Sequence, residues 1–142
     1  MRRGSFDDSR PLLLILLPVT LEDFAQREPV EQLLGAPGVV AVDPPRVPLS
    51  VTLAQAVAKR QVKRLRLPGY PRAIAICDER QLPLAAALIE RHPEAELWSL
   101  SAHRPDADFT LDLATATDLR PAWERMERLG VESGRLGSER VL

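Results

Sequence analysis

The sequence predicts an α/β fold: a doubly wound, mainly parallel sheet of about five strands with helices on both faces. Short apolar runs alternate with segments of helical length along the 142 residues. Three of these runs are nearly continuous in hydrophobicity, which is typical of strands covered on both faces. Because parallel neighbours need a crossover connection, the segments between the runs are expected to be helices.

Length and composition favour one domain without a strong charge field. We place a single Rossmann-like domain at 1–130 and expect a loose tail over 131–142, because "VESGRLGSERVL" has two glycines and little core. The hydrophobic fraction is 45%, the charged fraction 27% and the net charge −1. A balanced charge of this kind disfavours nucleic acid and anionic membranes as partners.

The first apolar run, "LLLILL" (12–17), follows two arginines, as the core of a signal peptide would. Asp7 and Asp8 interrupt the positive region, and the run is too short to span a bilayer. We therefore interpret it as a buried strand, and expect no membrane span and a cytoplasmic location.

Two further runs complete the expected inner part of the sheet. "VVAV" (39–42) and "AIAIC" (73–77) are predicted to be inner strands next to 12–17. "ELWSL" (96–100) is the fourth strand, and "DFTLDL" (108–113) alternates like a half-exposed fifth one. Only "SAHRPDA" separates the last two, so we expect the fifth strand to be antiparallel or to lie elsewhere in the sheet.

The helices are predicted from apolar periodicity and from their ends. Thr20 and Asp23 have the spacing of an N-terminal cap, and Pro29 is expected to split the helix that follows. A helix within 50–69 separates an apolar face from a basic one, and two more helices lie within 83–93 and 118–130. The basic face can meet phosphates or simply be solvated; the lack of interleaved aromatics favours the second.

Polar residues follow the predicted strands. In open α/β sheets, ligands bind outside the carboxyl ends of the strands. The candidate ligand-binding residues at that edge are Thr20, Asp43, Asp78, Glu79 and His103. Four of them also have a simpler interpretation: Asp78 and Glu79 as residues of a helix start, Asp43 as part of a rigid turn before two prolines, and His103 as a solvated loop residue.

The sequence holds few other signs of chemistry. The single cysteine, Cys77, ends an apolar run, so we expect a structural thiol, no intrachain disulfide and no cysteine-based metal cluster. No phosphate loop follows the first strand, and neither a metal nor a cofactor is expected. A triad of His103 with Ser99 or Ser101 and Asp106 would need a convergence that neighbours on one loop rarely achieve.

The order of landmarks resembles the amino-terminal half of GT-B type bacterial glycosyltransferases. "PVTLEDFAQREPVEQLL" followed by "VVAVDPPR" is similar to that family's Q-R, helix and strand ending in D/E-P-P, and "DADFTLDLATATDLRPAWERMERLG" is similar to the close of its domain. The part that holds the nucleotide-sugar donor in that family has no counterpart in these residues.

This resemblance implies a half-domain that binds a small polar ligand such as a nucleotide sugar, or completes a site with a partner chain or a second copy. The alternative is a structural or regulatory interaction module without a catalytic role. The first hypothesis predicts a polar pocket at the carboxyl edge of the sheet. The second predicts an exposed apolar patch and an edge filled by the chain's own side chains.

Overall fold

The computed structural model describes residues 10–18, 27–43, 51–101, 103–116 and 118–134, with the side chains of 51–54 excepted. Its strands are β1 (Pro11–Leu16), β2 (Val39–Val42), β3 (Tyr70–Ile76), β4 (Glu96–Ser99) and β5 (Phe109–Thr110). Its helices are α2 (Arg27–Leu34), α3 (Val51–Arg64), α4 (Leu82–Arg91) and α5 (Arg120–Arg128), and a 3₁₀ turn, η2 (Glu79–Gln81), precedes α4. Strands and helices alternate up to β4, as the sequence predicts, and β5 follows β4 without a helix.

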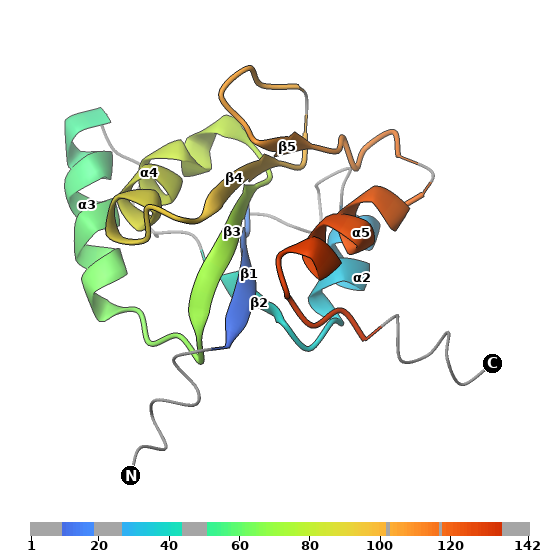
Figure 1. Ribbon diagram of the computed structural model, residues 1–142. Helices are drawn as coiled ribbons and strands as arrows, with labels where there is room; N and C mark the ends of the chain where they lie inside the picture. Colours follow the sequence, from blue (N-terminus) through green and yellow to red (C-terminus); the bar gives the residue numbers. More distant parts are fainter. Residues whose placement is uncertain (1–9, 19–26, 44–50, 102, 117, 135–142) are drawn as a thin grey trace, which may run out of the picture.

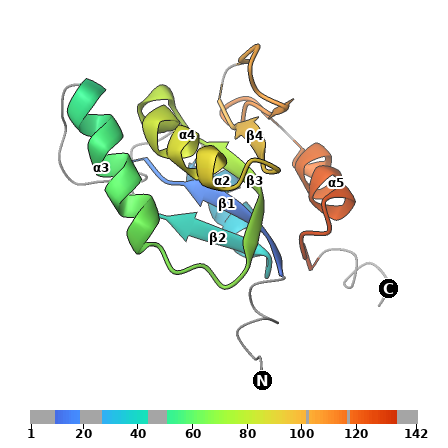
Figure 2. The same cartoon turned by 60° about the vertical axis from the view of Figure 1, so that its left-hand side comes forward.

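The five strands form one sheet of order β2-β1-β3-β4-β5, and every neighbouring pair is parallel. This is one of the two common orders of doubly wound sheets. Helices cover both faces: α2 and α5 lie on one side and α3 and α4 on the other (Figures 1 and 2). The predicted Rossmann-like α/β fold is thus confirmed.

The alternation of side chains along the inner strands builds two cores. In β1, Leu13 and Ile15 face α2 and α5, whereas Leu12, Leu14 and Leu16 face α3 and α4, and all five are fully buried. In a strand that is buried on both faces, no side chain reaches solvent, so every position favours an apolar residue. The continuous leucine run of the sequence is therefore explained by its central place in the sheet.

The expectation that 39–42 is an inner strand is wrong. β2 pairs only with β1 and forms one edge of the sheet, and Ala41 is exposed. The run is apolar because Val39 packs into one core and Val42 into the other. Two buried ends of a four-residue strand are enough to mimic the pattern of an inner one.

The expected placement of the fifth strand is also wrong: β5 lies beside β4 and is parallel to it. Phe109 pairs with Trp98, which is the third of the four residues of β4. After leaving the end of β4, the chain has to run back along the sheet by only about two residues, roughly 7 Å, before β5 begins. A short loop covers this distance, so no crossover helix is needed between these two strands.

An ion pair ties α5 to the edge of the sheet formed by β4 and β5. Arg125 donates to both carboxylate oxygens of Glu96, at 3.0 and 2.9 Å, and its guanidinium lies 5.7 Å from the ring centre of Phe109. Trp98 donates its indole N–H to the same carboxylate at 3.1 Å. These contacts hold the last helix against β4 and β5.

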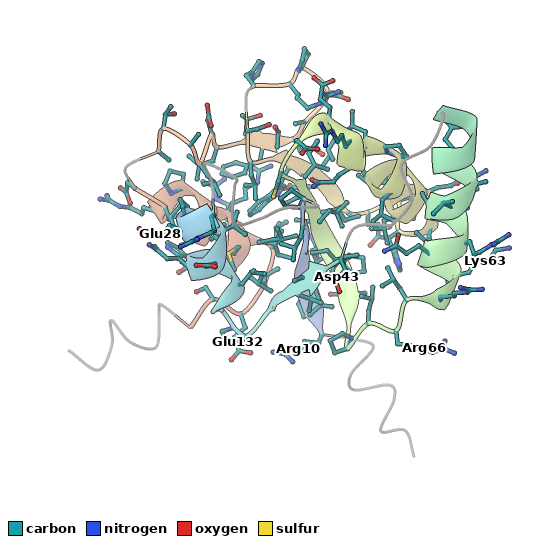
Figure 3. The ribbon with its side chains drawn as sticks, turned by 180° about the vertical axis from the view of Figure 1, so that it is seen from behind. Arg10, Glu28, Asp43, Lys63, Arg66 and Glu132 are labelled. Atoms are coloured by element: carbon teal, nitrogen blue, oxygen red, sulfur yellow. The ribbon has the colours of Figure 1, made fainter. Side chains whose placement is uncertain are left out.

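The chain keeps packing after α5. Val131 is buried in the core of α2 and α5, and the carbonyl of Glu132 accepts the backbone N–H of Gly38 at 2.7 Å. The carboxylate of Glu132 also lies 3.5 Å from Arg10, near the start of β1 (Figure 3). Residues 131 and 132 of the predicted tail are thus anchored, and 135–142 lie outside the described residues.

Candidate functional site

The ends of the five strands lie level along one edge of the sheet. In register, Val42, Leu16, Ile76, Ser99 and Thr110 form one row across it. Asp43, Asp78 and the loop that carries His103 all follow that row. Asp43, Asp78 and this loop therefore lie at the same edge of the sheet, its carboxyl edge, and Thr20 lies outside the described residues.

The edge includes a topological switch point between β1 and β3. From β1 the chain passes through α2, on one face, to β2; from β2 it passes through α3, on the other face, to β3. The connections diverge at the ends of β1 and β3, which is where doubly wound folds bind ligands. Cys77 and Asp78 follow β3 at this point, whereas Asp43 is separated from them by β1, about 10 Å in strand spacings.

Asp78 caps the turn that leads into α4. Its backbone is extended, with φ −156° and ψ 177°, and its carboxylate accepts the N–H of Arg80 at 2.8 Å. This is the contact that an N-cap aspartate makes with a helix start. The carboxylate is half-buried, so its position is set by the turn itself.

Gln81 closes the same turn from inside. Only 5% of this residue is exposed, and its Oε1 accepts the backbone N–H of Cys77 at 2.5 Å and that of Asp78 at 3.2 Å. Asp78 and Gln81 together form a reciprocal capping box. The two amides at the end of β3, which a bound anion would use, are thus already bonded.

The sequence analysis selected Asp78 but missed Gln81, the other residue of the capping box. Its signature, an aspartate followed three residues later by a glutamine, stands in the sequence as Asp78-Glu79-Arg80-Gln81. The polar character of Gln81 points to a surface residue, yet the turn buries it. The spacing rule, not the residue type, would have identified it.

The other candidates are exposed and dispersed. Asp43 is exposed at the end of β2, where its backbone carbonyl accepts the side-chain N–H of Gln61 from α3 at 2.9 Å. Glu79 is exposed on η2, and its carbonyl accepts the N–H of Leu82. His103 is exposed on the loop between β4 and β5.

Two members of the candidate nucleophilic triad differ in burial from Ser99, one of its two candidate serines. Ser99 is fully buried in β4, whereas His103 and Asp106 are exposed on the loop that follows. Asp106 is paired with Arg104 at 3.1 Å, and this hydrogen bond lowers the pKa of the Asp106 carboxyl. The structure therefore pairs Asp106 with Arg104, and the fully buried Ser99 is not accessible to a substrate.

Cys77 is a core residue, as predicted. It is fully buried, and burial, with the nearby charge of Asp78, raises the pKa of its thiol to about 12. A thiol that stays protonated at neutral pH is a poor nucleophile. Within the described ranges, no group of three His, Cys, Asp or Glu side chains could hold a metal ion.

Comparison with protein-family models, with curated proteins and with solved structures found no match to this chain. None of the helices in the described part is long and apolar enough to cross a bilayer. The described residues therefore form a Rossmann-like α/β domain in which a capping box closes the turn at the switch point.

Proposed function

We propose that this chain is a non-catalytic protein-interaction module with a structural or regulatory role. The observation that carries the proposal is the closed turn at the end of β3. There, the carboxylate of Asp78 and the amide of Gln81 bind the chain's own backbone instead of facing a ligand. The most reactive side chain nearby, the Cys77 thiol, is buried and protonated.

The rival hypothesis is the half-domain implied by the glycosyltransferase resemblance. It requires free donors at the switch point for a phosphate or free acceptors for a sugar hydroxyl. The backbone N–H groups of Cys77, Asp78 and Arg80 already donate hydrogen bonds within the turn, so these three donors are not free for a phosphate. The lack of free donors at the end of β3 favours the interaction module.

A thermal-shift screen of nucleotides and nucleotide sugars tests the proposal. A ligand present at a hundredfold its dissociation constant stabilises the folded state by about 2.7 kcal/mol. For a domain of this size that corresponds to a rise in Tm of roughly 5–10 °C. The proposal predicts no rise with any member of the screen, and a saturable rise would contradict it.

Two matched variants locate the cause of any effect. Asp78→Ala removes the cap at the candidate site, and Asp118→Ala removes a similar aspartate contact, to the N–H of Arg120 at 2.9 Å, just before the N-cap of α5. Each should lower the free energy of unfolding by about 1 kcal/mol. If a ligand were found and only Asp78→Ala weakened its binding, Asp78 would be a ligand-binding residue and the module hypothesis would fail.

A further inference from the structure

One segment of this chain has a net positive charge, whereas the rest of the chain is acidic. Residues 44–77 contain seven basic residues and no acidic residue. The remainder of the chain has twelve basic and twenty acidic side chains, a net charge of −8. A net charge of −1 for the whole chain therefore hides a strong separation of charge.

Most of this positive charge lies on α3 and just beyond it. Ala58 and Val62 bury the inner side of the helix against the sheet. The basic face, which consists of five exposed side chains, lies elsewhere: Lys59, Arg60, Lys63, Arg64 and Arg66. Lys63 projects from α3 away from the sheet, on the opposite side of the molecule from Glu28 (Figure 3).

The basic face has no acidic partner within the described residues. The four ion pairs among the described residues involve other arginines: Arg10, Arg104, Arg120 and Arg125. The two cations of the last turn, Lys63 and Arg64, stabilise the helix dipole. That explanation does not extend to the preceding turn or to the residues after the helix.

We propose that the basic face of α3 binds an acidic segment of a partner protein. The inference rests on the proposed function, because it assigns the surface and the partner of the interaction module. Lys59 and Lys63 form one row of cations and Arg60 and Arg64 a second, and successive cations in a row rise by about 6 Å. Carboxylates on alternate residues of a strand, or one turn apart on a helix, have nearly the same spacing.

The observations favour an acidic protein segment over other polyanions. A guanidinium fork binds a carboxylate or a phosphate through two parallel hydrogen bonds, so the choice between them rests on shape and on the surrounding charge. Nucleic acid and membranes are extended, so they would also meet the acidic remainder of the chain, whereas a short peptide meets α3 alone. The residues between Lys59 and Arg66 include no aromatic side chain for base stacking, and the buried Ala58 and Val62 offer nothing to insert into a bilayer.

Fluorescence anisotropy with a labelled hexaglutamate peptide tests the proposal on the full chain at low ionic strength. We expect saturable binding that weakens as salt is added, and no binding of a hexaglutamine peptide. The triple variant Arg60→Gln, Lys63→Gln, Arg64→Gln should bind hexaglutamate roughly tenfold more weakly or worse. Its melting temperature shows whether the fold is retained.

A control variant removes the same amount of charge elsewhere. Arg27→Gln, Arg91→Gln, Arg128→Gln replaces three exposed arginines from α2, α4 and α5. Compared with the wild type at about 0.1 M salt, where exposed charges more than about 10 Å from the peptide are largely screened, its affinity for hexaglutamate should stay within about twofold. An equal loss in both variants would overturn the proposal.

Two further outcomes would also overturn it: no binding of hexaglutamate, or tighter binding of a DNA duplex or of phosphatidylserine vesicles than of the peptide. These results concern α3 only. The nucleotide-sugar screen concerns the carboxyl edge, so failure of this inference and failure of the proposed function are distinguishable.

Discussion

Replacing Gln81 with methionine should destabilise the domain, because the amide oxygen of this residue holds the end of β3. Its Oε1 accepts two backbone N–H groups, one from the fully buried Cys77 and one from the half-buried Asp78. Methionine has a similar length and flexibility, so the substitution removes the acceptor without leaving a large cavity.

The magnitude follows from the burial of each donor. An unsatisfied buried N–H costs about 1–3 kcal/mol, and a partly solvated one loses about 0.5–1.5 kcal/mol. Loss of Nε2, for which the described residues provide no hydrogen-bond partner, offsets part of this cost. We therefore expect a loss of about 2–3 kcal/mol, or roughly 5–10 °C in Tm.

Urea and thermal unfolding of the variant measure this loss. Gln55→Met, an exposed position on α3, is the matched control and should change stability by no more than about 0.5 kcal/mol. If Gln81→Met unfolded at the same midpoint as Gln55→Met, the capping box would not stabilise the edge and the reasoning would be refuted.

The other predictions concern the core, the clamp on α5 and a close backbone contact. Cys77 should react with a thiol reagent only after unfolding, and rapid native modification would contradict its raised pKa. Burial opposes the charge of Glu96, but the hydrogen bonds from Arg125 and Trp98 outweigh it and lower the pKa of the Glu96 carboxyl. The resulting stabilisation is complete above the unfolded-state pKa and should be lost as pH falls through the folded-state pKa. Unfolding measured over a pH series should therefore show a weaker acid dependence for Glu96→Gln than for the wild type. Gly38→Ala should destabilise far more than Gly35→Ala in thermal unfolding, because the added Cβ would lie 2.7 Å from the backbone nitrogen of Glu132, whereas at Gly35 the nearest atom is 3.4 Å away; equal losses would contradict this.

The sheet could be predicted from sequence where burial alone decides the pattern. The runs in β1 and β3 are apolar at every inner position, because helices cover both faces of these strands. β2 carries the same signal although it is an edge strand, since its two end valines reach opposite cores. The hydrophobicity of a strand indicates whether its two faces are covered, but it does not indicate whether the strand lies at the centre or at the edge of the sheet.

The candidate site could be predicted only in part. The level ends of the strands follow from parallel pairing, which placed Asp43 and Asp78 on one edge. Whether their side chains face a ligand depends on local bonds, and the capping box needs the spacing of Asp78 and Gln81 to be recognised. Contacts such as that between Glu96 and Arg125, which are 29 residues apart, have no local signal at all.

A titration of the ¹⁵N-labelled protein with a nucleotide sugar, followed by amide NMR shifts, tests whether the turn after β3 is closed to ligands. The amides of Cys77 and Asp78 report on the switch point, because both donate to Gln81 inside the closed turn. If the turn is closed, neither signal moves in a saturable way. A saturable shift centred on these two amides would mean that a ligand enters this edge, and the proposed interaction module would be wrong.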